Sequence, residues 1–136
     1  MSLTLRVLAP DQSVFDGPAD EVILPSTTGQ LGILPGHVSL LTALDYGVLR
    51  VRENNDWKAI ALQGGFAEIE ADEVTVLVNT AELGSAINAD EANKELEAAT
   101  AAANQFEGQA ASTEKLKAQQ ALSRARARVQ AATLNK

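Results

Sequence analysis

The sequence predicts an α+β protein with two parts: an N-terminal antiparallel β-sandwich or flattened barrel, followed by a C-terminal antiparallel two-helix hairpin. The composition changes sharply near Gly84. All four Pro, eight of nine Gly and nine of ten Val lie before residue 86, whereas residues 86–136 hold sixteen Ala. Val and turn residues favour strands, and Ala favours helices. We therefore divide the chain into a β part, residues 1–85, and a helical part, residues 86–136.

The β part shows short strands in which apolar residues alternate along the chain. This alternation begins at Leu3 and again at Val22. A later strand has two distinct faces, one formed by Val74, Val76 and Val78 and the other by Thr75 and Leu77. Many short strands at close spacing favour a small sandwich or flattened barrel over a parallel sheet with crossover helices.

Two tight hairpins are expected within the β part. Their strands are residues 48–53 with 57–63, and residues 66–70 with 73–79. The first connection is Asn54-Asn55-Asp56 and the second is Ala71-Asp72. Asn and Asp tolerate the left-handed backbone that a tight hairpin requires, so the first connection is the stronger signal.

The helical part opens with a marked helix start. Asn88 can cap the helix with its side chain, and Glu91, three residues on, can reach back to the free backbone amides. An apolar stripe then follows at helical spacing: Ala92, Leu96, Ala99, Ala103 and Phe106. Gly108 ends the stripe and gives the chain freedom to turn.

A second helix is expected after this turn, capped by Ser112 or Thr113. Its apolar stripe is Ala118, Leu122, Ala125, Val129 and Ala132. Two amphipathic helices with a short connection fold back as an antiparallel hairpin. The facing surfaces are mostly Ala, which buries little apolar area, so the hairpin is expected to be weakly held and able to move.

Composition excludes several classes of function. The 136 residues carry a formal net charge of -7, which disfavours nucleic acid as a general partner. The chain has no Cys and one His, so disulfides, thiolate catalysis, Cys-based zinc sites and His-rich metal sites are excluded. The first ten residues lack the apolar core of a secretory signal, and nowhere do about 18 apolar residues run together. Membrane association is therefore expected to be indirect.

The sequence shows no catalytic constellation. His37 is the sole imidazole, and the spacing to Ser39 and Asp45 does not order a nucleophile, a base and an acid. The glycines near residue 32 are not followed by the Lys-Ser or Lys-Thr of a phosphate-binding loop. We expect a noncatalytic interaction protein with no metal and no cofactor.

Positive charge is concentrated at the end of the chain. Residues 115–136 carry six basic and no acidic side chains, whereas residues 1–85 carry four basic and twelve acidic ones. At 100° per residue, Lys117, Arg124 and Arg128 share one face of the second helix. Two interpretations remain open: a solvated face with favourable charge near a helix C-terminus, or a surface that docks onto an acidic protein.

The most specific motif lies in the β part. Residues 29–37 read Gly-Gln-Leu-Gly-Ile-Leu-Pro-Gly-His, followed by Ser-Leu-Leu-Thr-Ala-Leu at 39–44 and Gly-Val-Leu-Arg at 47–50. This run resembles the signature of the epsilon subunit of F-type ATP synthases. The resemblance covers the whole β part, and residues 121–129 are similar to the basic C-terminal helix of that family.

The resemblance implies a flattened antiparallel β-sandwich of ten strands at the foot of a rotor. In that family the sandwich packs against the gamma subunit and against the polar loops of the membrane c-ring. The resemblance assigns the c-ring contact to Thr28, Gln30 and Leu31, with His37 beside them. Gln30 stands where relatives often carry Glu, so this contact would lack an anion.

The resemblance also implies a brake on ATP hydrolysis. In that family the C-terminal helices extend along gamma into the alpha/beta catalytic hexamer, where basic residues meet an acidic loop of the beta subunit. Lys117, Arg124 and Arg128 are the matching residues here. The Ala-rich seam can separate at modest cost, and the three cations would supply charge pairs in the extended state.

We predict weak or absent ATP binding. Some members of that family bind ATP through an Ile-Asp-x-x-Arg-Ala pattern and two C-terminal arginines. The matching positions here are Ile87, Asn88 and Glu91, with Arg124 and Arg128 retained. A carboxylate at Glu91 repels phosphate, so the site is degenerate. A calorimetric titration of the isolated chain with ATP is expected to give no binding heat, and micromolar affinity would contradict this prediction.

These implications define the expected partners and location. The partners are the gamma subunit, the c-ring and the alpha/beta hexamer, and the isolated chain is expected to be a monomer. The expected location is the cytoplasmic or stromal side of a bacterial plasma membrane or thylakoid membrane, as a peripheral protein. The alternative is a free-standing β-sandwich binding module whose helical hairpin mediates dimerisation, which predicts a stable oligomer of the isolated chain.

Overall fold

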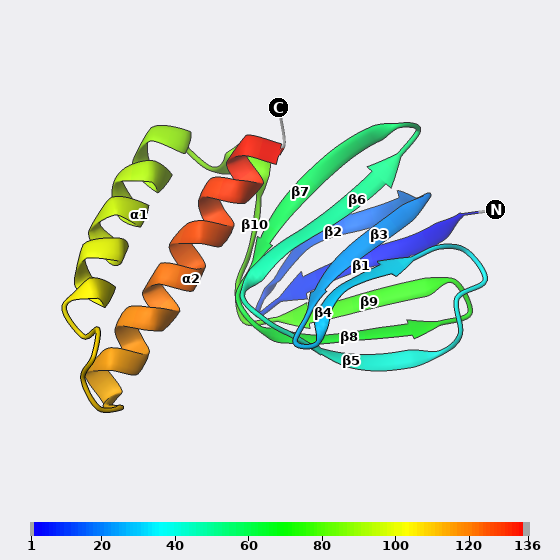
Figure 1. The fold of residues 1–136 in the computed structure, drawn as a ribbon. Coiled ribbons are helices and arrows are strands. Elements are labelled where there is room, and N and C mark those ends of the chain that lie inside the picture. The colour runs from blue at the N-terminus through cyan, green and yellow to red at the C-terminus, as the bar shows by residue number, and fades with distance from the viewer. Residues whose placement is uncertain (1, 135–136) are drawn as a thin grey trace.

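The computed structural model describes residues 2–134 and shows ten strands followed by two helices (Figure 1). The strands are β1 (Leu3–Ala9), β2 (Gln12–Ala19), β3 (Glu21–Ser26), β4 (Gly29–Ile33), β5 (Leu40–Leu44), β6 (Gly47–Glu53), β7 (Asp56–Leu62), β8 (Gly65–Glu70), β9 (Glu73–Val78) and β10 (Ala81–Leu83). A 3₁₀ turn (Gly84–Ala86) then leads to α1 (Ala89–Asn104) and α2 (Thr113–Leu134). The predicted fold class, a β-sandwich followed by a helical hairpin, is confirmed.

The strands form one continuous sheet that curls into two layers (Figure 1). Its order is β10-β7-β6-β3-β5-β8-β9-β1-β2, with β4 paired to β3 beside this path. Every pair of strands is antiparallel except β1 with β9, which is parallel over Thr4–Leu8 and Glu73–Leu77. The expectation of a purely antiparallel sandwich is wrong at this one pair. Because most of the sandwich separates β1 from β9 in the chain, no tight turn fixes their relative direction.

Both predicted hairpins are confirmed, including their backbone geometry. Asn54 and Asn55 have φ angles of 53° and 71°, and they connect β6 to β7. Ala71 and Asp72 have φ angles of 50° and 63°, and they connect β8 to β9. Two consecutive left-handed residues match the right-handed twist of the flanking strands. Ala71 lacks the polar side chain that usually eases this conformation, so its turn carries more backbone strain.

The main hydrophobic core lies between the two layers of the sandwich. It is built from alternating strand residues, and its largest members, such as Leu5, Leu24, Leu49, Ile60 and Val74, have at most 1% of their surface exposed. All buried members of this core fall between Leu3 and Ala81, before the helices begin. The sandwich therefore has a core of its own.

The helices begin where the sequence places their caps. The Asn88 side chain accepts a hydrogen bond from the backbone N–H of Glu91 at 3.0 Å. Ser112 Oγ, rather than Thr113, accepts from the N–H of Lys115 at 3.1 Å. Gly108 has a φ angle of 79° in the connection between the helices. Both helix starts and the turn between them are thus confirmed.

The second helix lies between α1 and the sandwich (Figure 1). The predicted stripe is present, with Ala125 and Ala132 buried. However, Ala127 and Ala131 are also buried, in a second cluster that includes Ala59 and Ala61 of β7. The expectation of a single apolar stripe on this helix is therefore incomplete. One side of α2 packs on α1, and another side packs on β6 and β7.

Candidate functional site

A cluster of charged side chains joins the helical hairpin to the sandwich. Arg128 lies on α2, Glu95 on α1 and Glu82 on β10. The Nε and Nη2 groups of Arg128 donate to the two carboxylate oxygens of Glu82 at 2.9 and 3.2 Å, and Nη1 donates to Oε2 of Glu95 at 2.6 Å. Two parallel bonds from one guanidinium to one carboxylate are among the stronger charged contacts in proteins. One arginine therefore ties three elements together.

The packing of α1 against α2 brings the side chains of Glu95 and Arg128 together. Glu95 is three residues from buried Ala92 and four from buried Ala99, so it lies beside the packed face of α1. Arg128 precedes buried Ala131 by three residues on α2. The two helices run side by side in opposite directions, which brings these positions opposite one another (Figure 1).

Partial burial and two carboxylates set the electrostatics of the cluster. The side chains of Arg128, Glu82 and Glu95 are 21%, 35% and 33% exposed. Burial lowers the pKa of Arg128, but the hydrogen bonds and attraction from Glu82 and Glu95 outweigh it, and the pKa is raised. A raised pKa on a cation adds stability that is lost only when the pH rises through that value. Arginine is protonated below about pH 12, so Arg128 stays charged across the neutral range.

The other predicted cations behave differently. Arg124 Nε lies 3.6 Å from Oε1 of Glu95, and its side chain is 46% exposed. Lys117 is exposed, lies about two turns before Arg124 along α2, and makes no ion pair within residues 2–134. The structure therefore gathers Arg124 and Arg128 around Glu95, and Lys117 stands apart.

The residues at the positions that match the family's ATP site have structural roles in this chain. Ile87 is 7% exposed and belongs to the second buried cluster. The Asn88 side chain caps α1, and Glu91 is exposed in the first turn of that helix. Arg124 and Arg128 face the carboxylates of the chain itself. A phosphate group would have to displace these carboxylates to reach the arginines.

Three of the predicted contact residues lie in or directly after the turn between β3 and β4: Thr28 is in the turn, and Gln30 and Leu31 are at the start of β4. Thr28 Oγ1 lies 3.2 Å from Oγ of Ser26, which is also 3.0 Å from Oγ1 of Thr42 on β5. Thr28 and Gln30 are exposed, whereas Leu31 is partly buried against the main core. The turn thus exposes polar side chains and is restrained by the hydroxyl contacts of Ser26. Leu31 packs the adjoining strand against the main core of the sandwich.

The structure does not place His37 beside this turn. Thr28 lies in the turn before β4 and His37 lies in the loop after it, so the length of β4 separates the two residues. His37 Nδ1 is 2.7 Å from the backbone oxygen of Val38, and the loop is held by the N–H of Gly36, which donates to Asp72 at 2.7 Å. The sequence motif is continuous, but β4 separates its two ends in space.

One surface was missed by the sequence reasoning. Leu8, Leu77, Phe66 and Ala43 are paired in turn across β1, β9, β8 and β5. Phe66 and Leu77 are 58% and 55% exposed, and Leu41, two residues from Ala43, is 67% exposed. We call these five residues the apolar row. The sequence signal for this row was Leu77, an apolar residue on the face of β9 opposite to Val74, Val76 and Val78.

Comparison with known proteins identifies the family. A family model described as "ATP synthase, Delta/Epsilon chain, beta-sandwich domain" matches residues 2–84. The ATP synthase epsilon chain of Synechococcus sp. (strain WH7803) is 74% identical over 97% of this chain and 97% of its own length. That of Prochlorococcus marinus (strain MIT 9303) is 72% identical over 96% of this chain and 98% of its own. The chain belongs to the ATP synthase epsilon family.

Two solved structures share the fold of this epsilon chain. A chain of the Euglena gracilis mitochondrial ATP synthase, OSCP/F1/c-ring, aligns with a TM-score of 0.80 at 21% identity, covering 97% of this chain and 81% of that one. A chain of the Tetrahymena thermophila central stalk and c-ring aligns with a TM-score of 0.59 at 20% identity, covering 96% of both. Because it belongs to the epsilon family, the protein is a subunit of the ATP synthase complex and not itself its catalyst.

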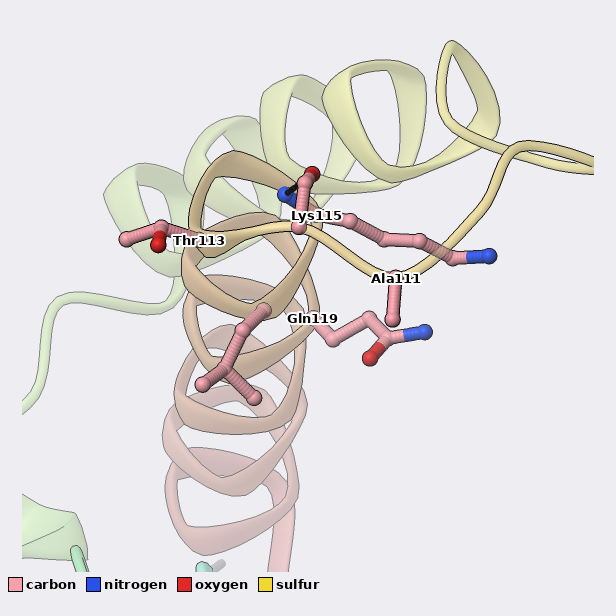
Figure 2. A pocket seen from close by; sticks show the side chains of 6 residues that line it. Ala111, Thr113, Lys115 and Gln119 are labelled. Carbon is pink, nitrogen blue, oxygen red and sulfur yellow. Dashed lines mark hydrogen bonds between the residues drawn. The ribbon is translucent and has the colours of Figure 1, made fainter.

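One hollow on the surface of the epsilon chain contains none of the predicted site residues. Figure 2 shows this hollow at the tip of the helical hairpin, where it occupies about 590 Å³. It is lined by Ala111, Ser112, Thr113, Lys115, Leu116 and Gln119. A second hollow of about 480 Å³ includes Gln30 and runs between the sandwich and the end of α2. No helix within residues 2–134 has the length and apolar character to span a bilayer.

Proposed function

We propose that this epsilon chain is a rotor element of the central stalk, which couples c-ring rotation to ATP synthesis and restrains ATP hydrolysis through its helices. The main support is the apolar row. Large exposed apolar side chains gathered on neighbouring strands are typical of a surface that binds another protein. We assign the row to the gamma subunit, which is the partner that the family resemblance gives to the sandwich.

We assign the c-ring contact to the turn between β3 and β4 together with the first residues of β4. Thr28 and Gln30 are exposed and polar, and the hydroxyl contact between Thr28 and Ser26 restrains the turn. These features suit a contact with polar loops by hydrogen bonds. Leu31 supports the turn from the core side, and His37, at the far end of β4, lies outside this contact.

We further propose that residues 86–136 move as one regulatory unit, distinct from residues 1–85. The main core of the sandwich contains no residue from the helices. On β7, α2 covers Ala59 and Ala61. Moving α2 away from this strand therefore exposes little apolar area that is now buried. In the extended state, Lys117, Arg124 and Arg128 would meet acidic residues of the alpha/beta hexamer.

The test is the ATPase rate of a matched catalytic core that contains gamma. The core is assayed with no added chain, with the full chain, and with residues 1–87 alone. The full chain is expected to bind and to slow hydrolysis several-fold, because its helices can reach the hexamer. Residues 1–87 retain the complete main core and are expected to bind without slowing hydrolysis.

Different outcomes would contradict the helical brake and the role in the central stalk. Equal rates with the full chain and with bound residues 1–87 would contradict the helical brake and leave the stalk role standing. If neither form binds the core, the stalk role itself is contradicted. A stable oligomer of the isolated chain would instead favour the binding module with a dimerisation hairpin.

The same proposal gives the protein its location. Its relatives in Synechococcus and Prochlorococcus are epsilon chains of cyanobacterial ATP synthases. We propose that this chain is a peripheral protein on the cytoplasmic or stromal side of a plasma or thylakoid membrane, held there by the complex.

A further inference from the structure

The geometry of Arg128 points to a latch made entirely within this chain. All three nitrogens of its guanidinium are committed, Nε and Nη2 to Glu82 and Nη1 to Glu95. Glu82 belongs to β10, and the other two side chains belong to different helices. Arg128 therefore holds α2 both to its partner helix and to the sandwich.

We propose that Glu82 and Glu95 latch the hairpin in its folded state by occupying Arg124 and Arg128. The alanine surfaces that meet along α2 contribute little buried area, so the contacts that hold α2 against both neighbours matter more here than in a leucine-rich hairpin. The bonds are charge-assisted and partly shielded from water, which makes them stronger than an exposed ion pair.

The latch excludes other acidic partners from the same arginines. A guanidinium has five N–H groups arranged in one plane, and Arg128 already directs all three of its nitrogens to the two glutamates. An acidic loop of another subunit or a phosphate group must break these bonds before it can form its own. This second consequence rests on the proposed function, whereas the latch within the isolated chain does not.

Amide hydrogen exchange on the isolated full chain tests the latch directly. The double variant Glu82→Gln with Glu95→Gln removes both negative charges and keeps the side-chain shapes. Its α2 amides, residues 113–134, are expected to exchange about tenfold faster or more, whereas the strands of the main core should keep wild-type rates. Exchange of α2 within about twofold of wild type would overturn the latch.

A thermodynamic cycle separates the latch from a general loss of stability. Arg128→Gln should accelerate exchange of α2 to a similar degree, and adding it to the double variant should cause little further change, because the same bonds are already lost. Fully additive effects would overturn the assignment. The controls are Glu97→Gln on α1 and Arg126→Gln on α2, which are exposed and make no ion pair within residues 2–134.

The catalytic core that contains gamma tests the competition for the arginines. The double carboxylate variant keeps Arg124 and Arg128 but frees them, so it is expected to slow ATP hydrolysis at a lower concentration than the wild-type chain. Equal potency would overturn the competition. A wild-type chain that does not slow hydrolysis at all would overturn the proposed brake instead, and the exchange experiment would still decide the latch.

Discussion

Replacement of Gly65 by alanine is expected to destabilise the sandwich by about 3 kcal/mol or more. Gly65 begins β8 with a φ angle of 138°, a conformation that residues with a Cβ rarely adopt. A Cβ there would lie 2.1 Å from the backbone oxygen of Leu77 and 2.8 Å from Cα of Val78. Both atoms belong to the paired strand β9, so they cannot move aside without breaking the ladder.

Thermal unfolding of the full chain, followed by the circular dichroism of its strands, measures this effect. A loss of about 3 kcal/mol lowers the midpoint by roughly 10 °C in a domain of this size. Gly32→Ala on β4 is the matched control, because a Cβ at Gly32 meets no atom within 4 Å. If Gly65→Ala unfolds at the same temperature as Gly32→Ala, the steric argument is wrong.

Replacement of Gly84 by alanine is expected to separate α2 from the sandwich while the sandwich stays folded. Gly84 is buried in the 3₁₀ turn where the two parts meet. A Cβ there would lie 2.3 Å from the backbone oxygen of Ala131 on α2 and 3.0 Å from that of Ala59 on β7. The strand is fixed by its ladder on both sides, so the helix is the element that must move.

Limited digestion with trypsin detects the separation, because α2 carries the cleavable residues Lys115, Lys117, Arg124, Arg126 and Arg128. The Gly84→Ala chain is expected to be cut within α2 about tenfold faster than wild type, and to leave an intact sandwich fragment. Ser85→Ala, at the exposed neighbouring position, should be cut at the wild-type rate. Cleavage of Gly84→Ala no faster than of Ser85→Ala would contradict the prediction.

Local signals in the sequence were sufficient for the turns and caps. Asn54 and Asn55 adopt left-handed backbone because their own side chains tolerate it, and Asn88 caps α1 through an amide only three residues away. The family was likewise readable from the run at residues 29–37, which is continuous in the chain. In each case the residues that decide the structure are neighbours in the sequence.

Contacts between distant segments were not readable in this way. Glu82 and Glu95 lie 46 and 33 residues from Arg128, and nothing in the spacing of charges pairs them. The second buried face of α2 was missed because Ala127 and Ala131 are as compatible with solvent as with a packed surface. His37 and Thr28 are close in sequence, but a strand carries them to opposite ends of the sandwich.

The parallel pairing of β1 with β9 has a consequence for how the chain is made. The sheet path runs through β9 to β1 and then β2, so the first strands complete it only when residues 73–77 are available. During synthesis, β1 and β2 can form a hairpin early but must wait for β9, which is the last long strand. Pairings this distant in sequence slow folding and leave strand edges exposed in the meantime. The nascent sandwich is therefore most vulnerable to aggregation shortly before its ninth strand leaves the ribosome.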